Sequence, residues 1–554
     1  MSPLDFATES AVRLWLEHDT DAHDRDDLAK DLRLASAGDL AALSRLHDGF
    51  GVPIAFGTAG MRARMTYGPS GMNVTNVRDF SQAVATVVEK DKSSLEVQRV
   101  VVGYDGRHKS LEFAQAAASV FASRGMDVLL FPRPAPTPVL AFYIRHLAAD
   151  AGVMITASHN PPHDNGYKLY MSDGRQIVSP TDSAIQDIRK IVVSDSSSDG
   201  HAYSLLPENF LDAYLSRLKS REHPSAIRVA YSAMHGVGAE TVRALYKDEP
   251  QVDIRFFGPQ EHPDPDFPTT PVPNPENQNS AKMLLDFAAS IDADIAIAND
   301  PDADRCAVGV RDGVDGWHLL TGDEVGAILG QHLASEGVSG SFACSVVSSS
   351  LLGKIASHHG IAHYTTLTGF KWLSRAPELS FAYEEAIGYC VDPSMVSDKD
   401  GVSAMHLITS LASKLSREGR SITEYLNDIF KEHGYHVTSQ KTIPCHAALI
   451  MPTPQEVTRA LSDNSSWVIS KSDKLLLSSG QETGTSSTEL DTSLGKTRVL
   501  VRKSGTEPIV KVYCETVMKD SSKEGKTKAL NLHDEIATRI KTSIELVKKH
   551  RTEM

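Results

Sequence analysis

The sequence predicts an α/β protein of four domains, with mixed sheets in the first three. Short apolar runs rich in Val, Ile and Ala alternate with stretches whose apolar residues recur at helical spacing. Repeated alternation of this kind favours α/β domains with parallel or mixed sheets. The length of 554 residues is enough for three or four domains of ordinary size.

Helices are predicted over the first fifty residues, where segment 32–50 has apolar residues at helical spacing. A strand at 100–105, a helix at 110–125 and a strand at 126–132 follow. The alternation of predicted strands and helices is not accompanied by a sequence repeat of fixed period. Four further apolar runs predict strands, and they span 151–157, 227–233, 293–300 and 341–349.

Composition divides the chain into four segments. A polar Ser/Asp stretch at 194–200 predicts a surface loop, and a new strand begins at Ile227. A turn near Thr321 starts a helix, and the chain becomes β-rich after Gly434. Residues Leu461–Thr492 are rich in Ser, Thr, Asp and Gly, which predicts a loop-rich or insertion-bearing region. The predicted domains are 1–220, 221–320, 321–437 and 438–554.

The formal net charge of −15 disfavours nucleic acid and anionic membranes as partners, because an acidic surface repels both. A phosphorylated ligand would be repelled too, so its site must gather Arg and Lys locally. No apolar run approaches the ~20 residues that span a bilayer, and the acidic N-terminus lacks a signal-peptide pattern. The 5 scattered cysteines form no CxxC pair, which favours a reducing, cytoplasmic location over a disulfide framework or a zinc ribbon.

Ser158 and His159 lie in the segment TASHNPP, which follows the strand predicted at 151–157. Loops at the carboxyl ends of strands hold the ligand sites of open α/β sheets. A serine beside a histidine could act as a nucleophile with a nearby proton carrier. The alternative is a turn in which Ser and Asn side chains bond their own backbone.

Asp300, Asp302 and Asp304 alternate along NDPDADR, directly after another predicted buried strand. Three carboxylates at this spacing repel one another unless a cation lies among them. Oxygen-only ligands suit Mg²⁺ or Ca²⁺, but an EF-hand is excluded because Arg305 and Arg311 stand where its Gly and Glu are required. The strand context favours a magnesium site over a solvated acidic turn.

The segment RKSGTEP, residues 502–508, joins two strand-like runs. Its glycine allows close backbone approach, and its Arg, Ser, Thr and free N–H groups could hold an anion. The alternative is a polar hairpin loop. Residues 57–62 and 105–107 could also offer Arg to a phosphate, although a structural turn is the default interpretation for both.

Two segments resemble nucleotide-binding motifs only in part. Residues 495–497, GKT, lack the earlier glycine of a P-loop, since Leu490 occupies that position. Residues 235–238, HGVG, follow a predicted strand, but Thr241 stands where a dinucleotide fingerprint has its third glycine. A tight strand-to-helix turn is predicted there instead.

TASHNP, DPDADR and RKSGTEP together resemble the α-D-phosphohexomutase superfamily, in which these segments occur in this order. The resemblance extends from about Gly57 to Glu515. GTAGMR, TLTGFKW, YEEAIGY and DKDG are similar to the branch that contains phosphoglucomutase-2, phosphopentomutase and bacterial phosphoglucomutases. The resemblance implies a heart-shaped molecule of four domains around one central cleft, with three similar α/β domains and a C-terminal α+β domain.

The resemblance also implies roles for particular residues. Ser158 would carry the phosphoryl group, and one of its phosphate oxygens would join Asp300, Asp302 and Asp304 in holding Mg²⁺. His159, Lys168, Arg62, Arg305 and Lys399 match positions near the reacting groups, and His159, Lys168 and Lys399 remain alternatives for the proton carrier. Contacts to the sugar would come from Thr368, Gly369, Glu384 and Glu385, and contacts to the non-reacting phosphate from Arg502, Ser504, Gly505 and Thr506.

The implied reaction is the interconversion of glucose 1-phosphate and glucose 6-phosphate, with glucose 1,6-bisphosphate as activator. Phosphopentomutase and glucose-1,6-bisphosphate synthase are the alternatives within the branch, and a non-catalytic sugar-phosphate sensor is the alternative outside it. Many members have Ser after the paired glutamates, whereas this chain has Ala386, which leaves the sugar open. The expected partner is a phosphosugar, and the expected state is a monomer or weak homodimer.

Overall fold

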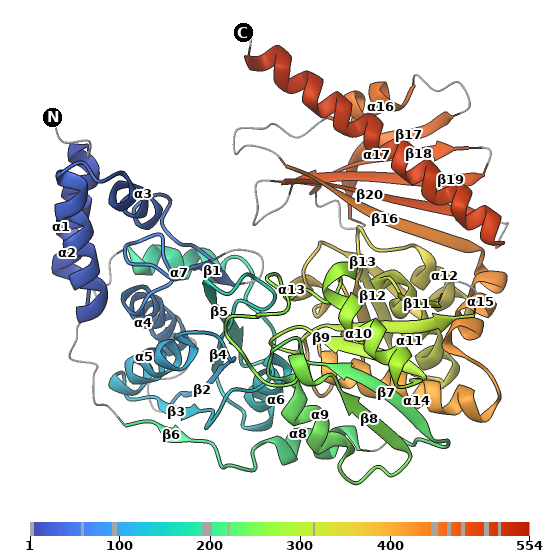
Figure 1. Cartoon of the computed structure of the whole chain (residues 1–554), viewed down its shortest axis with the longest axis horizontal. Coiled ribbons are helices and arrows are strands. Elements are labelled where there is room, and N and C mark those ends of the chain that lie inside the picture. Colours follow the sequence, from blue (N-terminus) through green and yellow to red (C-terminus); the bar gives the residue numbers. More distant parts are fainter. Residues whose placement is uncertain are drawn as a thin grey trace. The chain divides into compact units, whose positions relative to one another are not determined.

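The computed structural model of the chain (Figure 1) contains two compact units. One unit comprises Met1–Leu320 with Gly388–Arg417, and the other comprises Thr321–Ile387 with Glu418–Met554. Among the residues described, no helix is both long enough and apolar enough to cross a membrane. The structure describes residues 5–56, 60–90, 97–190, 202–219, 221–313, 316–444, 453–462, 467–477, 482–492, 494–503, 509–518 and 522–552.

Three helices open the first unit, as the sequence predicted: α1 (Phe6–His18), α2 (Ala22–Ser36) and α3 (Leu40–Gly49). Each begins after an aspartate whose carboxylate accepts hydrogen bonds from the first turn, because the first N–H groups of a helix have no partner within it. The apolar faces of the three helices form one cluster around Trp15, Leu28 and Leu46.

The first sheet has the strand order β1-β5-β4-β2-β3-β6 and is mixed. Strands β4, β2, β3 and β6 run parallel, whereas β5 is antiparallel to both of its neighbours. Helices α5 and α6 pack against its central strands, and α4 packs on α5 and α7. The strands are β1 (Met61–Arg64), β2 (Arg99–Tyr104), β3 (Asp127–Leu130), β4 (Ala151–Ile155), β5 (Asp164–Met171) and β6 (Ser204–Leu205). The helices are α4 (Val74–Lys90), α5 (Ser110–Ser123), α6 (Thr137–His146), α7 (Thr181–Arg189) and α8 (Leu211–Leu218).

The second sheet, ordered β11-β10-β9-β7-β8, is also mixed. Strand β9 runs parallel to β7 and antiparallel to β10, so the β9–β10 connection is a hairpin that carries the three aspartates. The strands are β7 (Ile227–Ser232), β8 (Val252–Phe256), β9 (Ile295–Asn299), β10 (Cys306–Asp312) and β11 (Gly316–Leu319). The first unit also contains α9 (Gly238–Tyr246), η2 (Gly258–Gln260), α10 (Gln278–Ser290), β15 (Gly388–Cys390) and α14 (Gly401–Arg417).

The second unit begins with a sheet in which β12 pairs in parallel with both β13 and β14. Helices α11 and α15 begin with reciprocal capping boxes, in which Thr321 pairs with Glu324 and Ser421 with Glu424. The strands are β12 (Ser341–Ser345), β13 (Ala362–Thr366) and β14 (Leu379–Glu384), and the helices are α11 (Gly322–Ser335), α12 (Leu351–His358), α13 (Phe370–Leu373) and α15 (Ile422–His433).

A five-stranded antiparallel sheet ordered β16-β20-β19-β18-β17 completes the second unit. Figure 1 shows the long helix α17 crossing this sheet, and the core beneath it contains Val499, Val512 and Ile536. On the opposite face, Leu500 and Tyr513 pack against Val346 and Val347. The elements are β16 (Tyr435–Pro444), α16 (Pro454–Ser462), β17 (Val468–Leu476), β18 (Glu482–Asp491), β19 (Gly495–Lys503), β20 (Ile509–Met518) and α17 (Lys523–Thr552).

The prediction of a loop-rich region at Leu461–Thr492 was wrong for most of the residues described there, while its alternative, an insertion-bearing region, stays a prediction. Strands β17 and β18 pair antiparallel across it. Their composition is polar because β17 is an edge strand whose side chains are mostly exposed, and because hydroxyls pair between strands, as Ser472 Oγ does with Thr488 Oγ1 at 3.0 Å. The four domain boundaries drawn from composition remain predictions.

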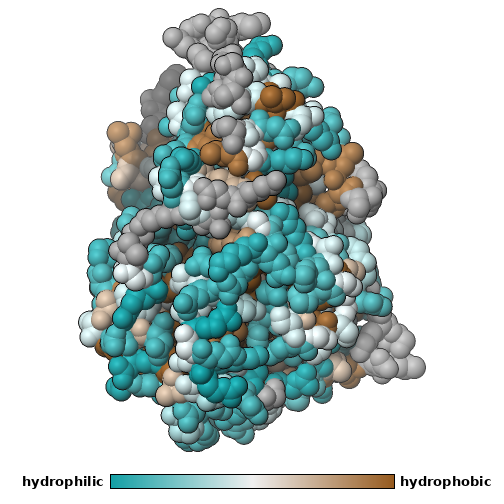
Figure 2. Space-filling model, turned by 90° about the vertical axis from the view of Figure 1, so that its right-hand side faces the viewer, coloured by the Kyte–Doolittle hydropathy of each residue, from teal (hydrophilic) through white to brown (hydrophobic). Residues whose placement is uncertain are grey.

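Hydrophilic residues predominate on the face shown in Figure 2, and its hydrophobic residues form small separate patches. Such patches are normal on a protein surface and call for no partner. The face accords with the mean composition of the chain, in which 23% of residues are charged.

His406 on α14 gives a pH-dependent prediction. Burial, followed by the charge of His223, lowers the pKa of His406 to about 3, and its Nδ1 lies 3.2 Å from Tyr246 Oη. The unfolded chain takes up this proton below about pH 6.5, so the free energy of unfolding should fall as the pH drops from 6.5 toward 3. The loss expected at pH 5 is about 2 kcal/mol.

Urea unfolding at pH 7.5 and pH 5 measures this loss. His406→Gln should lower stability at pH 7.5 yet lose less than the parent between the two pH values. The exposed His262 is the matched control, and His262→Gln should behave as the parent does. An equal loss in His406→Gln and the parent would rule out His406 as the titrating group.

Candidate active site

Ser158 lies in the loop after β4, at the carboxyl end of a strand that is buried throughout. Its side chain is 1% exposed, and its φ of 53° is uncommon for a residue other than glycine. Ser158 Oγ donates to Asp300 Oδ2 at 2.7 Å and lies 3.1 Å from His159 Nδ1. The loop therefore brings a serine hydroxyl directly to one carboxylate of the aspartate cluster.

Arg107 holds this loop by its backbone. The buried guanidinium is paired with Asp105 at 3.3 Å and lies over the ring of Phe267. It donates four hydrogen bonds of 2.6–3.1 Å to main-chain carbonyls of the serine loop, those of Ser158, Asn160, Pro161 and Asp164. Residues 105–107 thus serve the serine loop as a structural support.

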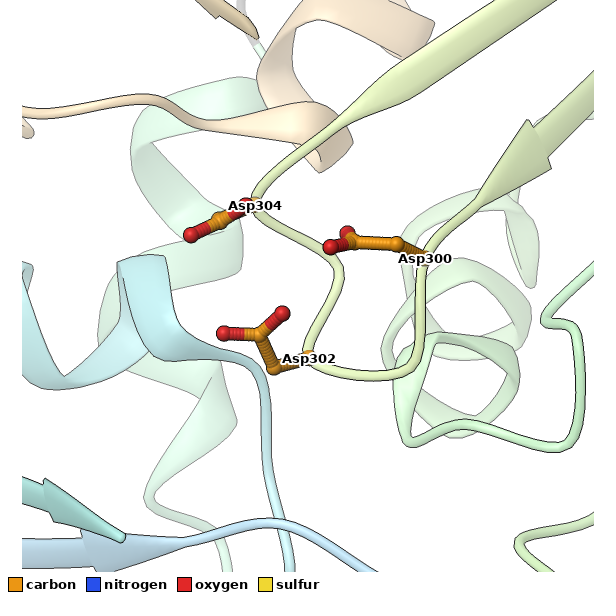
Figure 3. A group of neighbouring side chains, drawn as sticks. All are labelled: Asp300, Asp302 and Asp304. Atoms are coloured by element: carbon orange, nitrogen blue, oxygen red, sulfur yellow. The ribbon is translucent and has the colours of Figure 1, made fainter. Parts of the chain in front are cut away.

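The three aspartates lie in the β9–β10 connection, and Figure 3 shows their carboxylates turned toward a common space. One oxygen from each lies within 4.8 Å of the others, and all three side chains are buried. Asp302 Oδ1 and Asp304 Oδ1 accept no hydrogen bond from the part of the chain that the structure describes. Buried carboxylate oxygens without donors fit a hard divalent cation such as Mg²⁺.

Lys168 on β5 is the nearest positive charge to this cluster. Its Nζ donates to Asp302 Oδ2 and to Asp304 Oδ2, both at 2.7 Å. Burial raises the pKa of both carboxyls, but the nearby positive charges outweigh it and hold each pKa below its usual value. The pKa of Asp300 is raised instead, first by burial and then by the two neighbouring carboxylates. The cluster therefore carries more negative charge than Lys168 alone neutralises.

Lys399 reaches the cluster from the segment DKDG, with Nζ 3.5 Å from Asp304 Oδ2. Asp398 anchors this segment by accepting from Tyr170 Oη at 2.9 Å and from Gln176 Nε2 at 2.6 Å. A Cβ at Gly401 would lie 2.2 Å from the carbonyl oxygen of Arg305, so only glycine fits there.

Arg62, Arg305 and His159 complete the group. Arg62 on β1 donates to Asn160 Oδ1 at 3.3 Å, and the N–H of Arg305 donates to Asp300 Oδ1 at 3.0 Å. Burial, then the charges of Arg305 and Arg62, lowers the pKa of His159 well below its usual value. Sequence reasoning expected Arg and Lys to gather against the acidic net charge, and the structure brings four such side chains to this cluster.

The HGVG segment forms the tight strand-to-helix turn that the sequence predicted, between β7 and α9. A Cβ at Gly236 would lie 2.3 Å from Pro301 Cα, and the N–H of Val237 donates to the carbonyl of Pro301 at 2.9 Å. This turn therefore packs directly beneath the aspartate segment, a role that its sequence did not indicate.

The remaining predicted site residues lie in the second unit. Arg502 on β19 donates to Thr368 Oγ1, next to Gly369, where α13 begins. Glu385 Oε2 accepts from Ser345 Oγ at 2.9 Å and from Ser348 Oγ at 3.2 Å, and Glu384 ends β14. The predicted phosphate contacts Ser504, Gly505 and Thr506 lie outside the described residues.

Comparison with known proteins accounts for most of the chain. A Haemophilus influenzae protein named probable phosphomannomutase is 37% identical over 461 residues, which cover 81% of this chain and 94% of that protein. The chain belongs to the α-D-phosphohexomutase superfamily. The four domain models described as phosphoglucomutase/phosphomannomutase domains I, II, III and C-terminal match residues 53–192, 208–313, 321–433 and 490–530.

The resemblance inferred from the motifs is thus confirmed, and this α-D-phosphohexomutase is an enzyme of the phosphosugar mutase class. A Mus musculus phosphopentomutase is 37% identical over 72% of this chain and 70% of its own. A solved phosphoglucomutase/phosphomannomutase family protein from Burkholderia thailandensis shares the fold, with a TM-score of 0.67, 17% identity and coverage of 88% and 97% of the two chains. The four-domain α/β architecture with a C-terminal antiparallel-sheet domain is therefore that of the superfamily.

Proposed function

We propose that this phosphohexomutase is Mg²⁺-dependent and that Ser158 Oγ carries the phosphoryl group between its two half-reactions. The observation that carries the proposal is the 2.7 Å contact between Ser158 Oγ and Asp300 Oδ2. It unites the only predicted nucleophile with the predicted metal ligands in one buried group.

Each side chain of the group has a distinct part in this proposal. Asp300, Asp302 and Asp304 would hold Mg²⁺ together with an oxygen of the phosphorylated serine. Mg²⁺, when bound, would offset the charge of about −1.5 to −2 that phosphoserine carries and the charge that develops during transfer. Arg62 and Arg305 would bind the phosphoryl group while it is transferred.

Three groups remain candidates for proton transfer, and each has different contacts. His159 Nδ1 lies 3.1 Å from Ser158 Oγ, within reach of a hydroxyl proton. Lys168 donates hydrogen bonds to two carboxylates, so its main role in this proposal is to offset the negative charge of the aspartate cluster. The 3.5 Å contact of Lys399 with Asp304 leaves Lys399 a candidate donor to the sugar hydroxyl.

Two sugars are candidates for the substrate. The motifs favour glucose 1-phosphate and glucose 6-phosphate, whereas the phosphopentomutase relative favours ribose or deoxyribose phosphates. Ala386 removes a hydroxyl that could contact a hexose. Arg502 and Thr368, bonded to each other, would bind the non-reacting phosphate and the sugar of either substrate.

The test compares kcat/KM for glucose 1-phosphate and ribose 1-phosphate, with Mg²⁺ and glucose 1,6-bisphosphate supplied. Intact-mass and peptide analysis should locate phosphate on Ser158 of the purified enzyme. A preference for glucose supports phosphoglucomutase, and a preference for ribose supports phosphopentomutase. Turnover without any phosphate on Ser158, or activity that survives thorough chelation, contradicts the proposal. Binding of both sugars without turnover would favour a sensor.

A further inference from the structure

Four serines lie in or beside the turn that connects β12 to α12, and together they bond three carboxylates from separate elements. Asp323 on α11 accepts from the N–H of Ser349 at 2.7 Å. Glu385, in the loop after β14, accepts from Ser345 and Ser348. The third carboxylate is Glu515 on β20, in the C-terminal sheet. The serine turn, residues 345–350, therefore links a predicted sugar-contacting residue to a strand far away in sequence.

Glu515 is 5% exposed and is bonded through both of its oxygens. Oε1 accepts from Ser349 Oγ at 2.7 Å, from Ser350 N at 2.7 Å and from Ser350 Oγ at 3.0 Å, and it lies 2.9 Å from His436 Nδ1. Oε2 lies 2.9 Å from Arg498 Nη2. Although burial raises its pKa, Arg498 and His436 outweigh burial and keep Glu515 a carboxylate.

Arg498 extends the link toward the sugar-contacting residue. Its Nη2 donates to the carbonyl of Ser348 at 2.7 Å. The hydroxyl of the same serine donates to Glu385 Oε2 and accepts from the N–H of Glu385, each at 3.2 Å. The side chain and the backbone of Glu385 are thus both held by a residue whose own carbonyl is held by Arg498.

Strand β19 carries a second arginine, Arg502, whose side chain contacts a residue that was predicted to bind the sugar. Arg498 and Arg502 are four residues apart, so their side chains leave the same face of the strand, while Val499 and Val501 enter the core on the other face. Arg502 donates to Thr368 Oγ1. Strand β19 therefore contacts the Thr368 segment directly and the Glu385 segment through Ser348, and Glu515 on the adjacent strand fixes one of these two arginines.

We propose that Glu515 is a positioning residue for substrate binding, acting through Arg498 and the serine turn on Glu385; this inference rests on the proposed function. Glu515 lies in a different unit from Ser158 and the aspartates, so it should govern how well the sugar phosphate binds rather than whether Ser158 can be phosphorylated. Hydrogen bonds to charged groups are the stronger ones, and losing them leaves buried partners unsatisfied.

The experiment compares Glu515→Gln with Glu482→Gln. The control removes an exposed carboxylate, 3.3 Å from Lys474, in the same sheet. KM, kcat, phosphate on Ser158 and the thermal unfolding midpoint are measured for each variant, and calorimetry gives the Kd for glucose 1-phosphate and ribose 1-phosphate. Glu515→Gln should raise KM and Kd about tenfold or more, change kcat by less and leave the phosphate on Ser158 in place. Glu482→Gln should match the parent.

A purely structural role predicts a different result, in which the unfolding midpoint falls but KM and Kd of the folded enzyme stay at the parent value; that result overturns the inference. Arg498→Met should raise Kd similarly, and the double variant should be no worse than the more damaging single one, because both act on the same turn. Additive effects would contradict a shared path. If Glu515→Gln does not fold, Ser350→Ala removes one bond to Glu515 and should still raise Kd.

The proposed function and the positioning role of Glu515 can be refuted independently of each other. An enzyme without turnover and without phosphate on Ser158 refutes the proposed function, while the Kd ratio between Glu515→Gln and the parent still decides the role of Glu515. An active parent enzyme with an unchanged Kd in Glu515→Gln refutes only the positioning role.

Discussion

Ser158→Ala is expected to lower kcat of the mutase reaction by about 10⁴-fold or more and to leave the enzyme without phosphoserine. The variant loses the hydroxyl that contacts Asp300 Oδ2 at 2.7 Å. Sugar-phosphate affinity should change little, because Thr368, Glu385 and Arg502, which are predicted to contact the sugar phosphate, lie in the other unit. Single-turnover assays, mass analysis and calorimetry measure the three quantities.

Ser216 supplies the matched control. It is an exposed serine on α8 whose hydroxyl donates to a carbonyl of its own helix, and Ser216→Ala should keep parental kcat and phosphoserine. Parental kcat in Ser158→Ala would refute the phosphoserine mechanism. A loss of fold, visible as a lower unfolding midpoint, would instead show that the hydroxyl is structural.

Lys168→Met is expected to produce the largest change in stability. The Lys168 side chain is 2% exposed, and its ammonium group bonds two buried carboxylates at 2.7 Å. Removing one partner of a buried ion pair typically costs about 3–5 kcal/mol. Without divalent cation the variant should therefore unfold at a lower temperature. Added Mg²⁺ should raise its unfolding midpoint more than that of the parent, because the aspartates lose a competing positive charge.

Lys190→Met is the control for this comparison, since Lys190 pairs with Asp187 at 2.8 Å on an exposed helix end. Its unfolding midpoint should move little, because exposed ion pairs contribute about 0–1 kcal/mol. Calorimetric melts with and without Mg²⁺ measure both variants. If Mg²⁺ shifts the unfolding midpoint equally in Lys168→Met and the parent, the aspartate cluster is not the cation site.

The sequence could predict the aspartate cluster because its signal is local. Three carboxylates within five residues, directly after an apolar strand, are expected to lie close together in space where the strand ends. Ser158 also follows a strand end, but its segment alone left a polar turn open, and the resemblance of the combined motifs singled it out. Which strand ends meet is decided by sheet order and by packing of the first sheet beside the second, and the motifs alone do not contain that information.

Arg107 and Glu515 show where sequence reasoning stops. Arg107 acts on main-chain carbonyls more than fifty residues away, and a carbonyl has no sequence signature. The alternation in VKVYCETV places Glu515 opposite Cys514, but nothing in that pattern indicates the serines that satisfy it. The polar strands β17 and β18 were missed because ladder hydrogen bonds, rather than apolar side chains, carry their pairing.

The hold of Arg107 on the serine loop has a consequence for the energy of the reaction cycle. In the serine loop the guanidinium bonds main-chain carbonyls, so we expect the loop to keep its shape whether Ser158 bears a hydroxyl or, as proposed, a phosphate. In the proposed mechanism, the charge on that oxygen would change by about 1.5 to 2 units in each cycle. A loop that does not rearrange when this charge changes has a low reorganisation energy. Phosphoryl transfer from Ser158 and phosphoryl transfer back to it would then occur in the same preorganised environment.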